Sequence, residues 1–154
     1  MPAPQEADIF LVPLLNGDHT VGQVIEVEKT PEKSVLCLLS LKRLTPDDTS
    51  APLNLSEMIA LVLTRPDHFA DGTWPIIGFE QLPQIEKVFK LAEAKSNGFE
   101  NVAIHEPAII EAFANACHGH YPWDAFPDPQ FFDRLLVTKA ARPPAARMKS
   151  QFPA

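Results

Sequence analysis

Residues that can bind a metal or act as nucleophiles gather in one short stretch between Cys117 and Asp124. The stretch holds a thiol, two imidazoles at His118 and His120, and a carboxylate. These groups are the donors of tetrahedral zinc sites, but zinc motifs space their ligands as CxxC or HxxxH, and the sequence has neither spacing. A small metal-binding protein or enzyme that uses these four residues is one candidate function, and metal analysis of the purified chain would test it.

The position of Cys117 argues against covalent catalysis. Cys117 shares an apolar stripe at helical spacing with Ile110 and Phe113, near the C-terminal end of the helix. The helix dipole raises a thiol pKa at that end, whereas a nucleophilic cysteine needs a lowered one. His118 and His120 are better explained as groups that help to satisfy the last helix carbonyls. No serine lies in a G-x-S-x-G elbow and no glycine-rich phosphate loop occurs, so we predict no enzyme activity, cofactor or metal.

An aromatic and acidic loop follows this helix. It contains Tyr121, Trp123 and two prolines, with carboxylates at Asp124 and Asp128. Aromatic anchors surrounded by polar groups are typical of protein interfaces. We predict that Trp123 and Asp124 bind a partner, supported by Tyr121 and Asp128. The alternative is that this loop only covers the core.

Charge is distributed unevenly along the chain. The net charge is −7, yet all 20 acidic residues lie in residues 1–133 with only 8 Lys and Arg, which gives −12 for that part. Residues 134–154 carry 5 basic groups and no acid. An acidic body repels phosphate and attracts basic surfaces. We therefore predict a basic protein partner and no nucleic-acid binding.

The first half of the chain is predicted to form β-strands. Asn16-Gly17 between two apolar runs is typical of a two-residue hairpin turn, and a continuous apolar run indicates a strand buried on both faces. The Leu and Met content of the fourth segment also allows a helix there. Strands are predicted at 8–14, 19–28, 34–44, 58–64 and 73–78.

The second half changes to helical spacing. One helix is predicted after Pro83, a second from Pro107 to a C-terminal glycine at Gly119, and a third after Asp128-Pro129. The predicted fold is α+β: an N-terminal antiparallel sheet of about five strands. The sheet could curl into a partial barrel, and two or three C-terminal helices would pack on it.

The predicted domain organisation is a single globular domain over 8–138. Residues 1–7 are expected to be loose, and the Pro-rich basic residues 139–154 have no apolar period and are expected to form a mobile tail. Cys37 and Cys117 lie in apolar stretches and are predicted to be free thiols. No segment has the roughly 20 apolar residues of a membrane span, and we predict a cytoplasmic protein with no membrane contact.

Four stretches, at 8–14, 22–24, 74–78 and 123–124, resemble in order and spacing the immunity protein 26 family of bacterial polymorphic toxin systems. This resemblance implies a protein encoded beside a secreted toxin, which binds that toxin and protects the producing cell. It implies no particular site residues. A general protein-interaction module unrelated to toxins is the alternative, and the neighbouring gene distinguishes the two. The oligomeric state is left open.

Overall fold

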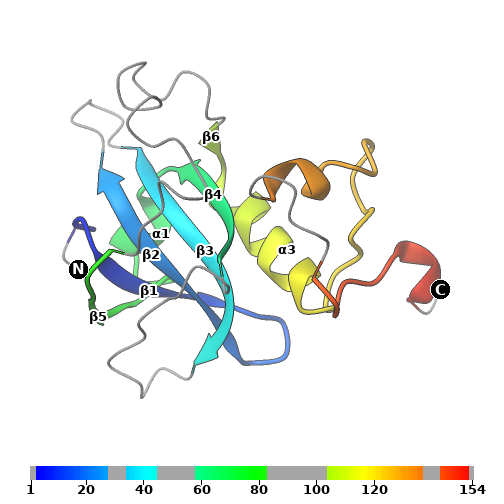
Figure 1. Cartoon of the computed structure of the whole chain (residues 1–154), viewed down its shortest axis with the longest axis horizontal. Coiled ribbons are helices and arrows are strands. Elements are labelled where there is room, and N and C mark those ends of the chain that lie inside the picture. The colour runs from blue at the N-terminus through cyan, green and yellow to red at the C-terminus, as the bar shows by residue number, and fades with distance from the viewer. Residues whose placement is uncertain (1–2, 28–33, 45–57, 83–103, 137–142, 153–154) are drawn as a thin grey trace.

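The structure, a computed structural model, describes residues 3–27, 34–44, 58–82, 104–136 and 143–152. It is an α+β fold built on an open six-stranded sheet with the order β5-β1-β2-β3-β4-β6 (Figure 1). The strands are β1 (Asp8–Pro13), β2 (His19–Val27), β3 (Val35–Leu44), β4 (Met58–Thr64), β5 (Ile76–Phe79) and β6 (Ile104–His105). β1 to β5 pair antiparallel as predicted, whereas β6 adds a parallel edge beside β4. The sheet is therefore mixed and does not close into a barrel.

The strands follow the predicted segments closely except at β5. This strand begins at Ile76, not at 73, because the preceding residues turn back toward a short helix, α1 (Asp67–Ala70). The Trp74 N–H donates to the His68 carbonyl at 2.9 Å, and the Trp74 side chain is buried. The sequence analysis did not predict α1. None of the described helices has the length and apolar character needed to cross a membrane.

The main helix, α3, lies on one face of the sheet (Figure 1) and spans Pro107–Cys117, as predicted. Its buried stripe, with Ile110 and Phe113, packs into the same core as Phe10 and Cys37 of the sheet. The neighbouring residues of β1, which point to the opposite face, are buried in a second cluster. Residues 34–40 of the third strand are all buried, so the prediction of burial on both faces is confirmed.

The prediction of an α-helix after Asp128-Pro129 is wrong. The chain forms only a single 3₁₀ turn there, η3 (Phe132–Leu135). The turn ends because Leu136 has extended backbone angles and forms an isolated β-bridge with Ala60 of β4. A pairing partner on the sheet therefore competes with continued helix. The helix predicted after Pro83 lies outside the described residues.

The C-terminal end of α3 is a Schellman motif, which confirms the predicted role of Gly119. The Gly119 N–H donates to the Ala116 carbonyl at 3.2 Å, and the His120 N–H donates to the Asn115 carbonyl at 2.8 Å. This pairing requires a left-handed residue after the helix, and Gly119 has φ +79°. The motif fixes the direction in which the chain leaves the helix toward Trp123.

Both chain ends contact the body more than the sequence analysis predicted. At the N-terminus, Pro4 is buried, and the Ala7 N–H donates to the Val24 carbonyl at 2.8 Å. At the other end, Ala146 and Met148 pack against the core. We call residues 143–152 the C-terminal strap. This part of the segment that was expected to form a mobile tail therefore contacts the body, although it has no apolar period of its own.

Candidate functional site

The residues first considered for chemistry do not converge on one site. Cys117 is buried on the stripe of α3, and burial raises the pKa of its thiol, which opposes thiolate formation. His118 Nε2 lies 3.3 Å from the hydroxyl of Thr20, while Asp124 accepts the backbone N–H of Lys149 at 2.6 Å. Across the residues that the structure describes, no three or more His, Cys, Asp or Glu side chains are grouped to hold a metal ion.

The environment of His118 makes it a neutral group. Burial, with smaller contributions from the positive charge of Arg43 and from His120, lowers the pKa of His118 to about 4. At pH 7 the ring is therefore uncharged and does not supply a cation at the helix end. That role belongs to Arg147, whose guanidinium donates to the Gly119 carbonyl at 3.1 and 2.8 Å.

Trp123 is not an exposed anchor, so its burial argues against the predicted contact with a partner, which stays a prediction. Its side chain is 1% exposed and packs against Phe113 and Phe132, with ring centroids 5.8 and 5.6 Å away. Its indole N–H donates to Asp133 Oδ1 at 3.0 Å. The alternative stated for this loop, that it covers the core, describes Trp123 correctly.

The other predicted contact residues have different surroundings. Asp128 accepts the N–H of Gln130 and forms an ion pair with Arg134, so its carboxylate already has partners. Asp124 is half-buried and bound to the backbone of the C-terminal strap. Tyr121 is half-buried and lines a surface hollow. Of the four predicted residues, Tyr121 is the one that lines this hollow.

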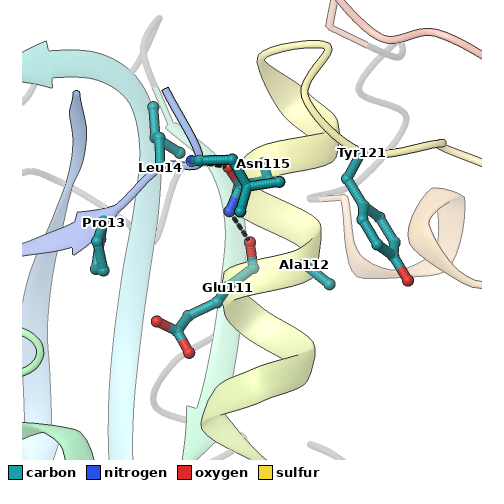
Figure 2. A pocket seen from close by; sticks show the side chains of 7 residues that line it. Pro13, Leu14, Glu111, Ala112, Asn115 and Tyr121 are labelled. Atoms are coloured by element: carbon teal, nitrogen blue, oxygen red, sulfur yellow. Dashed lines mark hydrogen bonds between the residues drawn. The ribbon is translucent and has the colours of Figure 1, made fainter. Parts of the chain in front are cut away.

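This hollow has a volume of about 360 Å³ and lies between the β1–β2 hairpin and α3. Figure 2 shows Glu111, Ala112 and Asn115 along α3, with Pro13 and Leu14 on one side and Tyr121 on the other. We call it the hairpin groove. Its lining is mostly apolar, with one carboxylate, one amide and one phenol. The complete lining consists of Pro13, Leu14, Leu15, Glu111, Ala112, Asn115 and Tyr121.

The hairpin turn gives the groove an exposed apolar rim. The Leu14 N–H donates to the Asp18 carbonyl at 2.8 Å, so three residues form the loop where Asn16-Gly17 predicted two. Gly17 takes the left-handed conformation, φ +94°, that such a loop requires at its last position. The extra residue is Leu15, whose side chain is 72% exposed.

A buried amide joins the hairpin to the helix. Asn115 is 5% exposed; its Oδ1 accepts the Leu15 N–H at 2.6 Å, and its Nδ2 donates to the Glu111 carbonyl at 2.8 Å (Figure 2). A buried donor or acceptor that loses its partner is costly, so this side chain fixes the hairpin against α3. It therefore sets the position of Leu15 at the groove rim.

Asn115→Ala should lower the free energy of unfolding by about 1 to 3 kcal/mol, because it leaves the Leu15 N–H without its acceptor. Hydrogen exchange gives the sharper readout. The Leu15 amide should exchange faster in the variant, while the amide of Ile110, one turn earlier in α3, should keep its rate. Equal protection of Leu15 in both proteins would show that Asn115 does not hold the hairpin.

One acidic side chain forms part of the groove wall. Glu111 is 26% exposed, and its Oε1 lies 3.2 Å from His68 Nε2. On the far side of the imidazole, Nδ1 lies 3.5 Å from Asp71. Hydrogen bonds from Thr73 hold the pKa of the Asp71 carboxyl below its usual value. The Glu111 carboxylate therefore lies next to the apolar side chains of the groove. It can bind a cationic side chain of a segment in which an adjacent residue is apolar.

Six of the seven lining residues were missed by the sequence analysis. Two signals could have found them. Asn115 is a polar residue on the buried stripe of α3, which indicates that its amide makes a specific hydrogen bond. Leu15 is an apolar residue inside a hairpin turn, where polar residues are usual. Comparison of the chain with family models, curated proteins and solved structures gives no match.

Proposed function

We propose that this chain is a binding protein that captures a basic protein partner through the hairpin groove. The observation that carries the proposal is an exposed leucine, Leu15, at the rim of an apolar hollow of about 360 Å³. A large apolar side chain in water next to a concave apolar surface is a feature of interaction sites. An apolar side chain of the partner would fill the hollow and cover Leu15.

The charge of the body supports a basic partner. Residues 1–133 carry a net charge of −12, and Glu111 places one carboxylate on the groove wall. Long-range attraction brings oppositely charged surfaces together faster, and a local carboxylate selects a Lys or Arg side chain at the contact. The partner segment that fits best is therefore an apolar residue next to a cationic one.

The sequence resemblance supports a more specific role for the same surface. If the chain acts as the immunity protein 26 family does, the basic partner is the toxin domain encoded beside it, and binding neutralises that toxin in the cytoplasm of the producing cell. If the partner that binds in the groove is not a toxin, the proposed contact site still stands. Only the proposed role in neutralising a toxin is then lost. Growth of cells that express the adjacent toxin, with and without this chain, separates these outcomes.

The association rate with the adjacent-gene toxin domain tests the role of charge. We expect the association rate to fall by about tenfold or more as the salt concentration is raised. The dissociation rate should change less. Glu111→Gln should weaken affinity by about tenfold, the typical effect of removing one interfacial charge pair, and should reduce the salt dependence.

Glu6→Gln is the matched control for this experiment. Glu6 is exposed and precedes β1, at the end of that strand opposite the groove, so the variant makes the same charge change away from the contact. It should alter the rate far less than Glu111→Gln. A salt-independent association rate, or equal effects of the two variants, would contradict the proposed acidic contact.

A further inference from the structure

The C-terminal strap occupies a defined seat beside the end of α3. A Cβ atom at Gly119 would lie 2.6 Å from the Ala145 carbonyl oxygen, so the strap backbone rests directly on the glycine. The Arg147 guanidinium donates twice to the Gly119 carbonyl, at 3.1 and 2.8 Å. This carbonyl lies at the negative end of the helix dipole, which favours a cation there. The seat therefore requires glycine at position 119 and favours an arginine two residues after the carbonyl that rests on it.

Main-chain hydrogen bonds continue the contact beyond Gly119. The Trp123 N–H donates to the Arg147 carbonyl at 2.8 Å, and Asp124 Oδ1 accepts the Lys149 N–H at 2.6 Å. Side chains alternate from Ala146 to Met148: these two pack against the core, whereas Arg147 between them is exposed. The strap then turns into a 3₁₀ helix, η4 (Lys149–Gln151). Period-two alternation with main-chain bonds is the way in which proteins bind extended peptides.

The charges of the seat and the strap are complementary. The strap carries two basic residues, Arg147 and Lys149, and no acid. The segment under the strap contributes the carboxylate of Asp124 and the helix-end carbonyl. The inward side chains of the strap are few: Pro143 is buried, and Ala146, Met148 and Phe152 are half-buried. Hydrogen bonds supply the rest of the contact, with the bonds from Arg147 part-buried and the bond to Asp124 exposed, so removing the Arg147 bonds should loosen the strap.

We propose that residues 119–124 form a second recognition site, for an extended basic segment of a partner protein, and that the strap is the intramolecular occupant of this site. The partner segment carries an arginine and an apolar residue directly after it. Tethering gives the strap an effective concentration in the millimolar range, so it competes with any partner segment of ordinary affinity. This site shares Tyr121 with the hairpin groove but binds through Gly119, Trp123 and Asp124, and it does not rest on the function proposed above.

The test uses the full-length chain and a synthetic peptide of residues 144–152. Arg147→Ala in the chain should loosen the strap, and faster hydrogen exchange of the Trp123 amide reports its release. The peptide should then bind the Arg147→Ala chain at least tenfold more tightly than it binds the unmodified chain, whose seat is occupied. A peptide that itself carries Arg147→Ala should bind neither.

Two further probes separate recognition from simple docking of the chain's own tail. A foreign peptide that keeps only the residues at the positions of Arg147 and Met148 should bind the Arg147→Ala chain within about tenfold of the native peptide. Gly119→Ala fills the seat, so that variant should bind neither peptide. Thermal melting confirms that both variant chains are folded.

Several results would overturn this proposal. One is an unchanged Trp123 exchange rate in the Arg147→Ala chain, because Arg147 would then not hold the strap. Another is a released strap with no binding of the native peptide. Binding of the native peptide without the foreign one would restrict the seat to the chain's own tail, and a dimer of the unmodified chain that the peptide dissociates would assign the seat to a second copy.

Discussion

Trp123→Ala should lower the free energy of unfolding by about 3 to 5 kcal/mol, as replacements of large buried aromatic residues do. The Trp123 side chain is 1% exposed and contacts Phe113 of α3 and Phe132 of η3, so its removal opens a cavity between two elements. It also leaves Asp133 without the indole donor. Urea denaturation of the variant and the unmodified chain, fitted with a common m-value, measures the difference.

Trp123→Phe is the matched variant. It keeps an aromatic ring in the core and removes the hydrogen bond to Asp133, so the expected loss is about 1 to 3 kcal/mol, smaller than that of Trp123→Ala. The fraction of either variant that remains folded should bind the partner with unchanged affinity. A Trp123→Ala chain with near-native stability and a large loss of affinity would instead restore the interpretation of this residue as a binding anchor.

The strands and the main helix could be predicted because their signals are local. Alternating or continuous apolar runs set the first four strands, and Pro107 and Gly119 mark the two ends of α3. The parallel strand β6 could not be predicted in this way. It has only two residues, and it forms because β4 offers an edge with which Ile104 and His105 can pair. Such pairing depends on the assembled sheet and has no period of its own.

The candidate site was harder to predict because composition does not tell which way a side chain points. Trp123 and Tyr121 lie two residues apart in one loop, yet Trp123 is buried in the core while Tyr121 reaches the groove. The groove itself joins parts of the chain that are far apart. The hydrogen bond between Leu15 and Asn115 spans 100 residues, and no local pattern could indicate it.

The strap was mispredicted for a related reason. Its sequence has few apolar residues, and the burial of such residues is what normally offsets the entropy cost of ordering a segment. The contacts that hold it are backbone hydrogen bonds and the Arg147 guanidinium on the Gly119 carbonyl. These contacts need the shape of the helix end, which appears only after the rest of the domain has folded.

The central claim is that the hairpin groove with Leu15 is the partner-binding site, and Leu15→Arg tests it. Because the side chain is 72% exposed, the variant should keep its stability within about 0.5 kcal/mol. A positive, bulky side chain at the groove rim should weaken binding of a basic partner by about 100-fold, the scale of an interface hot spot. Phe79→Arg is the matched control, since Phe79 is 77% exposed and pairs with Asp8 at the opposite end of β1.

The deciding measurement is the Kd of the proposed basic partner, tested as the product of the adjacent gene, for the unmodified, Leu15→Arg and Phe79→Arg chains at one salt concentration. The two variants make the same change in net charge at equally exposed apolar residues. The proposed site predicts a loss of about 100-fold for Leu15→Arg and a change of less than about threefold for Phe79→Arg. Unchanged affinity in Leu15→Arg, or an equal loss in both variants, would contradict it.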